Sequence, residues 1–234
     1  MKIIAINGSP RKGWNSARLL EKWKEGVLSV IPDAEVKEVN LYDLKFTGCR
    51  SCFSCKLKGG KFFGTCPIPD GIHDLLAEIR EADAVGIASP IYYMDMNAFT
   101  KCLIERMVFS VAQYSAPPVS LAPKRVSFTM LYSMNATEEA FKGYGIEDRC
   151  AMTERFLSLF YFMPVHRVTA FDTYQFSDYG KYESSAFSEP HKRQWHDEHF
   201  PKDLQSAFVE GVKVAHEIQD PTVKGEPIDH TVHF

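Results

Sequence analysis

The sequence predicts an α/β fold, a doubly wound parallel sheet of five strands with helices on both faces. Short apolar runs typical of strands alternate with longer segments whose apolar residues recur at helical spacing. Right-handed crossovers between parallel strands then give three layers, with the sheet in the middle. The predicted strand order is 2-1-3-4-5, and sheets of this kind bind ligands at the carboxyl ends of strands 1 and 3.

The five strands are expected at residues 2–7, 35–40, 83–89, 125–131 and 165–171. The helices are expected at residues 15–30, 72–81, 96–113, 147–162 and 201–218, each with an apolar face. The run from Asp83 to Ser89 is apolar on both faces, which is typical of a buried parallel strand. Tyr132 to Tyr144 is expected to be a polar loop, and Arg106, late in the third helix, a solvated or sheet-edge charge.

Composition places limits on the protein class. A chain of 234 residues can bury one sizeable core, so we expect a single domain over residues 1–220, with residues 221–234 as a C-terminal arm. Hydrophobic residues make up 45% and charged residues 24%, as in soluble globular proteins. The formal net charge of −3 gives no indication of a nucleic-acid partner, and the apolar runs are too short to span a membrane. We therefore expect a cytoplasmic protein.

The loop after the first strand predicts a phosphate site. Gly8, Pro10 and Gly13 form a tight loop, and a helix begins near Asn15, so unpaired helix-terminal amides are available to an anion. The spacing of Gly8 and Gly13 matches a P-loop, but Trp14 and Asn15 stand where Lys-Ser would follow, and no dinucleotide fingerprint is present. An ordinary strand-to-helix turn with polar capping residues is the alternative. The candidate phosphate ligands are Ser9, Arg11, Lys12, Asn15 and Ser16.

The turn after the third strand supplies a second candidate surface. Pro90 restricts Ser89 to extended geometry, and the aromatic and thioether side chains that follow suit a flat, polarizable ligand. The alternative is a pair of core aromatic residues under a loop. The candidates here are Pro90, Ile91, Tyr92, Tyr93 and Met94.

The motifs of these two loops resemble those of the NADPH-dependent FMN reductase family. The first match is Gly8-Ser9-Pro10-Arg11-Lys12 with Asn15-Ser16, and the second is Ser89-Pro90-Ile91-Tyr92-Tyr93. The resemblance covers residues 1 to 110 well and the rest in outline. It implies a flavodoxin-like fold, bound FMN, NAD(P)H as electron donor, and a third flavin-contacting loop from Tyr132 to Asn135, with Tyr132 and Ser133 as its candidate contacts.

Four cysteines resemble the compact cluster that the iron–sulfur flavoprotein branch of this family inserts between the two motifs. Cys49, Cys52 and Cys55 have the C-x₂-C-x₂-C spacing of bacterial ferredoxins, and Cys66-Pro67 supplies a fourth thiol. The ten residues between Cys55 and Cys66 depart from that branch, whose gap is usually shorter. A [4Fe–4S] cluster, zinc and reduced thiols remain open within this cysteine-rich loop of residues 47–70.

The sequence thus favours an FMN-dependent oxidoreductase that takes hydride from NAD(P)H and passes electrons to a small-molecule or protein acceptor. We name no catalytic side chain, because hydride transfer is the chemistry of the cofactor. The alternatives are a non-enzymatic electron carrier like flavodoxin and a zinc-stabilised binding module. Residues 172–200 are expected to be an irregular insertion, and their many aromatic residues predict a homodimer or homotetramer unless they fold back on their own domain.

Overall fold

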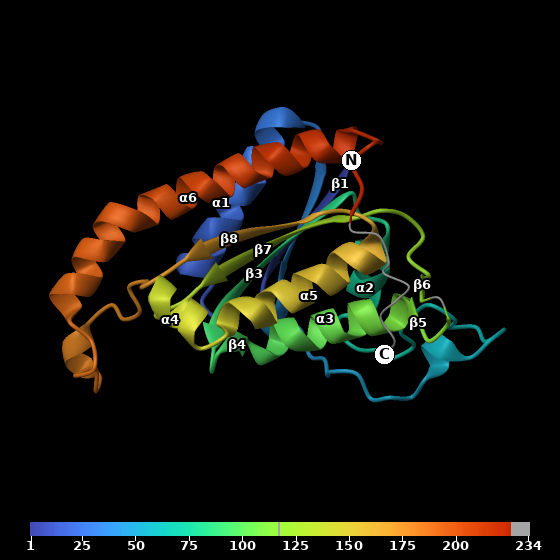
Figure 1. The fold of residues 1–234 in the computed structure, drawn as a ribbon, viewed down its shortest axis with the longest axis horizontal. Coiled ribbons are helices and arrows are strands. Elements are labelled where there is room, and N and C mark those ends of the chain that lie inside the picture. The colour runs from blue at the N-terminus through green and yellow to red at the C-terminus, as the bar shows by residue number, and fades with distance from the viewer. Residues whose placement is uncertain (117, 226–234) are drawn as a thin grey trace.

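The computed structural model describes residues 1–116 and 118–225. Its main sheet has the order β2-β1-β3-β7-β8, with all these neighbours parallel, and β4 pairs antiparallel with the end of β3. The predicted fold class and the order 2-1-3-4-5 are confirmed (Figure 1). The strands are β1 Lys2–Asn7, β2 Glu35–Asn40, β3 Ala84–Tyr92, β4 Asp95–Met96, β7 Ser127–Ser133 and β8 Val165–Ala170.

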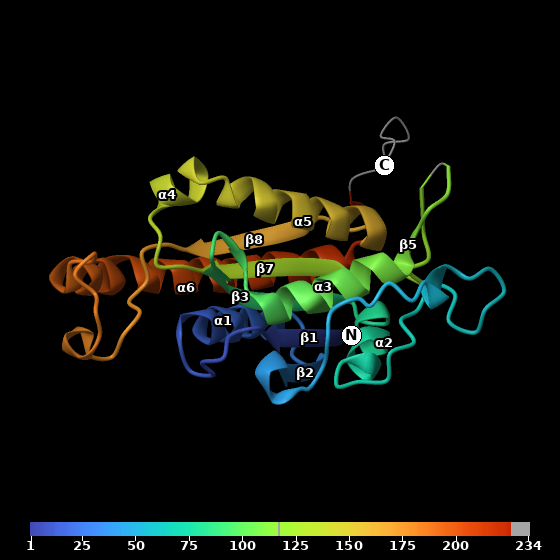
Figure 2. The same cartoon turned by 90° about the horizontal axis from the view of Figure 1, so that it is seen from below.

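Helices cover both faces of this sheet, as the alternating pattern predicts (Figure 2). One core cluster joins the sheet to α2, α3 and α5, and a second joins it to α1 and α6. The helices are α1 Asn15–Val30, α2 His73–Arg80, α3 Ala98–Val111, α4 Glu138–Gly143, α5 Ile146–Tyr161 and α6 Glu189–Gln219. A small hairpin, β5 Ala112–Gln113 and β6 Val119–Ser120, follows α3, and short 3₁₀ turns lie at Leu41–Asp43, Ser54–Lys56 and Tyr179–Lys181.

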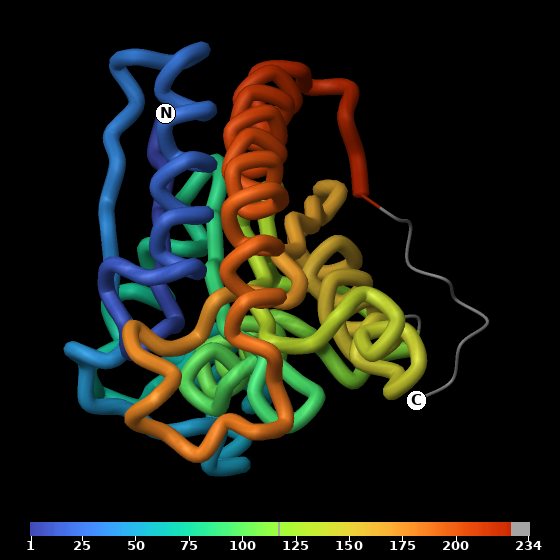
Figure 3. Tube along the Cα trace, turned by 90° about the vertical axis from the view of Figure 1, so that its left-hand side faces the viewer, coloured from blue at the N-terminus to red at the C-terminus, as the bar shows by residue number. Residues whose placement is uncertain are grey.

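Helices α1 and α6 lie side by side, and two glycines allow their backbones to approach (Figure 3). A Cβ atom on Gly26 would stand 2.1 Å from the carbonyl oxygen of Phe208, and one on Gly211 would stand 2.1 Å from that of Trp23. Any larger residue at either glycine would push the helices apart. This packing supports α1, whose first turn faces the carboxyl edge of the sheet.

The last helix differs from the prediction in where it begins. It was expected from Pro201, but α6 starts at Glu189 and carries Pro201 inside it. Ser188 caps this helix through its side chain, which accepts from the amide of His191, and Pro190 lies in the first turn, where proline is tolerated. The irregular insertion is therefore shorter than expected, and Figure 1 shows α6 bending in its N-terminal part.

The region after the fourth predicted strand also differs. That strand, β7, extends to Ser133, so Tyr132 and Ser133 belong to the sheet rather than to a loop. Within the expected polar loop, Thr137 caps the short helix α4. In the described part of the chain, no helix is long and apolar enough to cross a membrane. The single-domain division stays a prediction, and residues 226–234 of the expected C-terminal arm lie outside the described residues.

Candidate functional site

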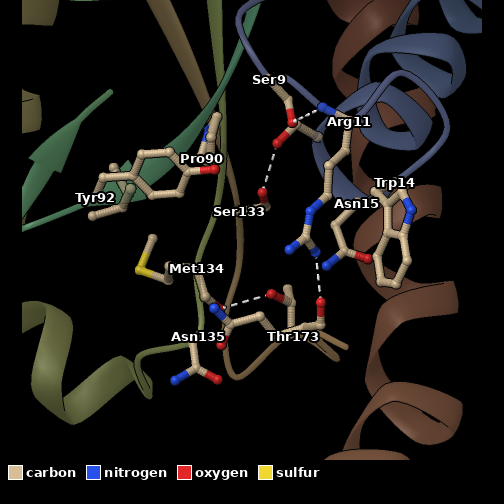
Figure 4. Close-up of a pocket in the computed structure, with 13 residues that line it drawn as sticks. Ser9, Arg11, Trp14, Asn15, Pro90, Tyr92, Ser133, Met134, Asn135 and Thr173 are labelled. Atoms are coloured by element: carbon tan, nitrogen blue, oxygen red, sulfur yellow. Dashed lines mark hydrogen bonds between the residues drawn. The ribbon is translucent and has the colours of Figure 1, made fainter. Parts of the chain in front are cut away.

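A pocket opens at the carboxyl ends of β1, β3 and β7 (Figure 4). Its volume is about 110 Å³, which is less than the several hundred Å³ typical of cofactor sites, so a larger ligand would extend beyond it. The walls come from the loop after β1, the ends of β3 and β7, and the segment after β8. The lining residues are Ser9, Arg11, Trp14, Asn15, Ser16, Pro90, Ile91, Tyr92, Ser133, Met134, Asn135, Thr173 and Gln175.

The first wall is built for an anion. The N-cap residue of α1, Trp14, makes no side-chain hydrogen bond to the helix, and its first turn holds no acidic residue. The side chain of Ser9 accepts from the amide of Arg11 at 3.1 Å, and the hydroxyls of Ser16 and Ser133 lie 2.7 Å apart. A helix start without a side-chain cap offers amides and a positive dipole end, and the hydroxyls and the guanidinium add donors. The structure therefore brings Ser9, Arg11, Asn15 and Ser16 to one pocket, and their role as phosphate ligands stays a prediction.

The segment after β8 crosses this wall. The Nη1 of Arg11 donates to the carbonyl oxygen of Gln175 at 2.5 Å, and the Nδ2 of Asn15 donates to that of Tyr174 at 3.0 Å. The guanidinium of Arg11 also lies 4.9 Å from the centre of the Trp14 ring. These contacts orient the side chains of Arg11 and Asn15.

The facing wall is apolar and comes from the second motif. Pro90, Ile91 and Tyr92 contribute it from the end of β3, and Met134 from the end of β7. Tyr92 is 46% exposed, so its side chain stands at the rim of the pocket. A flat ligand can therefore lie against this wall while its polar end reaches α1.

Four of the predicted flavin-binding residues lie outside the pocket. Lys12 is exposed and pairs with Asp43 at 2.7 Å. Tyr93 and Met94 form a turn with positive φ and do not line the pocket; Tyr93 is fully exposed. Tyr132 points into the core cluster beneath α5, because alternate residues of a strand face opposite sides of the sheet, and burial raises the pKa of its phenol well above the ordinary value.

Five lining residues were absent from the predicted set. Trp14 lies inside the first loop and could have been included, because it stands directly before the helix start. Met134 and Asn135 belong to the predicted third loop, although only Tyr132 and Ser133 were named as its candidate contacts. Thr173 and Gln175 carry no local signal, because the long-range hydrogen bond from the amide of Thr173 to the carbonyl oxygen of Met134 brings this segment to the pocket.

The cysteine segment, residues 47–70, runs along α3 to the end that lies away from this pocket (Figure 2). At that end Lys56 donates to the carbonyl oxygens of Phe109 and Ala112. Cys49 and Cys52 are exposed, Cys55 is buried and Cys66 is partly buried. Burial raises the pKa of the Cys55 thiol, whereas a backbone hydrogen bond from Ser54 lowers that of Cys52.

Arg106 holds this segment to α3 and is wholly buried, contrary to the prediction of a solvated charge. Its guanidinium contacts Asp70 at 2.6 Å, the Sγ of Cys66 at 3.3 Å, and the carbonyl oxygens of Thr47 and Ile68 at 3.2 Å. Burial opposes the charge on Arg106, but the hydrogen bonds to Asp70 and Cys66 raise its pKa. Burial likewise opposes ionisation of Asp70, and the Arg106 contact outweighs it and lowers the Asp70 pKa.

Comparison with known proteins assigns the chain to a protein family. The model of the NADPH-dependent FMN reductase family matches residues 1–140, which include both motifs and most of the pocket. The chain belongs to this family. Its predicted resemblance is thereby confirmed over more than half of the chain.

Curated relatives carry the iron–sulfur branch in their names. An iron–sulfur flavoprotein of Archaeoglobus fulgidus is 38% identical over 106 residues, which are 45% of this chain and 48% of the relative. An iron–sulfur flavoprotein of Methanocaldococcus jannaschii is 32% identical over 107 residues, 45% of this chain and 51% of the relative. The matched part spans about half the length of these relatives.

Solved structures agree with the fold. An NAD(P)H:quinone oxidoreductase from Methanothermobacter marburgensis superposes with a TM-score of 0.66 at 17% identity, over 92% of this chain and 98% of that one. An azoreductase from Bacillus anthracis superposes with a TM-score of 0.62 at 16% identity, over the same shares of the two chains. At these identities the likeness shows a shared flavodoxin-like fold.

The residues of the pocket fit the FMN that the family name implies. The α1 N-terminus and its donors suit a terminal phosphate, and the wall of Pro90, Tyr92 and Met134 suits a flat ring. Asn135 adds a buried Oδ1 that has no hydrogen-bond partner within the described chain. An unpaired buried acceptor is costly, so a donor on a bound ligand would stabilise it.

The cysteine segment, as folded, does not fit a metal cluster. Across residues 1–116 and 118–225, no group of three or more His, Cys, Asp or Glu side chains could hold a metal ion. Cys66 is engaged by Arg106 instead. Ligation by Cys49, Cys52, Cys55 and Cys66 would require this segment to rearrange, so we derive no chemical step through a cluster.

Proposed function

We propose that the protein is an FMN-dependent oxidoreductase that uses NAD(P)H as electron donor. The observation that carries this proposal is the uncapped start of α1 beside Ser9, Arg11 and Ser16, opposite an apolar wall at the same edge of the sheet. Membership of the NADPH-dependent FMN reductase family supports it as well.

The chain contributes binding and orientation. Ser9, Ser16, Arg11 and the α1 amides would hold the phosphate, while Asn15 ties the segment after β8 to the site through the carbonyl oxygen of Tyr174. When bound, FMN supplies acceptance of hydride from NAD(P)H and delivery of electrons to a second substrate. The exposed side chain of Tyr92 marks the open side of the pocket, from which a nicotinamide would approach.

Anaerobic reduction tests this function. Protein reconstituted with FMN is mixed with NADH or NADPH, and the visible flavin absorbance is followed with dithionite as the positive control. We expect bleaching with at least one of the two nucleotides. Bleaching by dithionite alone would favour the flavodoxin-like electron carrier, and failure to bind FMN would reject both functions.

The iron–sulfur cluster is a separate proposal. The C-x₂-C-x₂-C spacing and the names of the relatives support it, and the placement of Cys66 against Arg106 opposes it. Iron, acid-labile sulfide and zinc are measured on protein purified without oxygen. Four irons and four sulfides per chain would support a cluster, whereas FMN with neither metal would leave reduced thiols.

The proposed assembly into a homodimer or homotetramer also needs its own test. Some of the aromatic residues that motivated it contact one another, as in the tilted pair Tyr174–Tyr179 and the stacked pair Phe176–Tyr182, although Tyr182 and Phe187 stay exposed. Sedimentation at micromolar concentration distinguishes the assemblies from a monomer.

A further inference from the structure

A buried ion pair lies directly behind the pocket. Lys192 of α6 and Asp172, two residues after β8, contact each other through Nζ and Oδ1, and each side chain is 4% exposed. The same ammonium donates to the carbonyl oxygen of Asn135 at 2.8 Å. The Nε2 of His191 lies 2.7 Å from the second carboxylate oxygen of Asp172.

This pair is connected to the pocket wall by backbone hydrogen bonds. The amide of Asp172 donates to the carbonyl oxygen of Ala136 at 2.8 Å. The amide and hydroxyl of Thr173 donate to that of Met134 at 2.9 and 3.0 Å. Met134, Asn135 and Thr173 all line the pocket, so the pair holds the end of β7 and the start of the following segment together.

Stability of the fold gives a weak reason for such a pair. Removing an ammonium and a carboxylate from water costs several kcal/mol per ion, and apolar replacements are often as stable. Asp172 also adopts a left-handed backbone conformation with φ of 51°, which costs energy in a residue other than glycine. A costly pair placed at a ligand wall indicates a role in the geometry of that wall.

We propose that Lys192 is a positioning residue of the flavin site, which acts through Asp172 and the carbonyl of Asn135 to fix the Met134–Asn135 and Thr173 wall against the ring of FMN. This inference rests on the proposed function, and it extends that function to a residue of α6 outside the matched family region. Lys192 itself does not line the pocket.

The experiment measures FMN affinity, the visible circular dichroism of bound flavin and its reduction potential in four variants. We expect Lys192→Met to weaken FMN binding by about tenfold or more, because it leaves the buried Asp172 carboxylate beside an anionic cofactor with His191 as its remaining side-chain partner. That charge should also make the flavin harder to reduce. Lys192→Arg keeps the charge and should stay within about threefold of the parent. Lys202→Met removes an exposed lysine from the same helix and should change none of the three readouts.

The double variant Asp172→Asn with Lys192→Met separates positioning from folding. It removes both charges of the pair, so we expect it to fold and to recover the reduction potential of the parent. Its FMN affinity should stay at least about threefold below that of the parent, because the carbonyl oxygen of Asn135 has lost the Lys192 donor. Parental affinity and dichroism in this double variant would overturn the inference, whether or not Lys192→Met folds. A parent protein that binds no FMN would instead reject the proposed function.

Discussion

The two ends of α3 contact two different motifs, the loop after β1 and the cysteine segment. The structure gathers most of the predicted residues of the first into one pocket and leaves the thiols of the second at different depths. At the first end, Asn97 caps α3 and donates to the carbonyl oxygen of Gly8, so the helix is joined to the loop that forms the phosphate wall. At the other end, the cysteine segment follows α3 with its thiols spread from the surface to the core. Strand ends and a helix start thus bring the side chains of the first site into one pocket, whereas the thiols of the cysteine segment differ in exposure along an irregular loop.

The largest expected effect concerns the cysteine end. Replacing Arg106 by Leu removes the buried guanidinium that pairs with Asp70 and donates to two carbonyl oxygens, and we expect it to lower the free energy of unfolding by about 3–5 kcal/mol. Urea denaturation measures this loss. Lys101→Met removes an exposed partner of Asp95 from the same helix and should cost less than about 1 kcal/mol.

The same variant also tests whether the two ends are independent. FMN affinity of folded Arg106→Leu protein should stay within about threefold of the parent, since the pocket is held from β1, β3 and β7. A loss as large as that of a pocket variant would show that α3 couples the two motifs.

The next effect concerns the phosphate wall. Arg11→Glu places a carboxylate where an anion is expected and should weaken FMN binding by about 1–3 kcal/mol. Lys12→Glu makes the same change of charge one residue away, outside the pocket. Calorimetric titration compares them, and equal losses would mean that general charge rather than the pocket attracts the phosphate.

A third effect concerns α6, the helix that supports α1. Burial raises the pKa of the Asp203 carboxyl to about 7, against an ordinary value of 3.8, while Lys202 opposes the shift. The folded chain therefore keeps a proton that the unfolded chain releases, and the free energy of unfolding should fall as pH rises from about 4 to 7. Because the Asp203 carboxyl is partly solvated, we expect the free energy of unfolding to fall by about 1–2 kcal/mol, which is less than the full pKa shift would give.

Asp203→Asn removes this dependence. Its stability should exceed that of the parent at pH 8 and match it near pH 4, as measured by urea denaturation at both pH values. Asp197→Asn, six residues earlier on α6, should leave the pH dependence of the parent intact. The predicted sign is wrong if the free energy of unfolding of the parent rises between pH 4 and 7 and this rise is absent from Asp203→Asn.

The smallest expected effect concerns the apolar wall of the pocket. Tyr92 lines the pocket and its neighbour Tyr93 does not, so Tyr92→Ala should weaken FMN binding by about 0.5–1.5 kcal/mol and Tyr93→Ala should leave it unchanged. Fluorescence titration of the two variants makes the comparison. Weaker FMN binding in the Tyr93 variant alone would indicate that the flavin ring lies on the other side of this turn.

The sequence predicted the flavin end because local patterns determine it. Ser9, Arg11, Asn15 and Ser16 follow one strand and open one helix, and Pro90 to Tyr92 end the strand that pairs with it. Parallel pairing brings such strand ends to the same edge whatever the distant contacts are. Tyr132 lies in the core and outside the pocket; the sequence placed the end of this strand two residues too early and so assigned a residue of the sheet to a loop.

Other features depend on contacts that a local pattern does not contain. Arg106 is buried because Asp70, Cys66 and two carbonyl oxygens surround it from a segment 36 to 59 residues away. Thr173 reaches the pocket through Met134, 39 residues earlier. Pro201 favoured a helix start, but the cap at Ser188 and the packing of α6 on α1 extend the helix past it.

Comparative titration of the apoprotein with FMN and riboflavin tests the central claim most directly, because the two ligands differ only in the phosphate. The account predicts one FMN per chain, riboflavin binding at least about tenfold weaker, and a gap that closes in Arg11→Glu protein. Equal affinity for the two ligands in the parent, or a gap that persists unchanged in Arg11→Glu, would contradict a phosphate site at the start of α1.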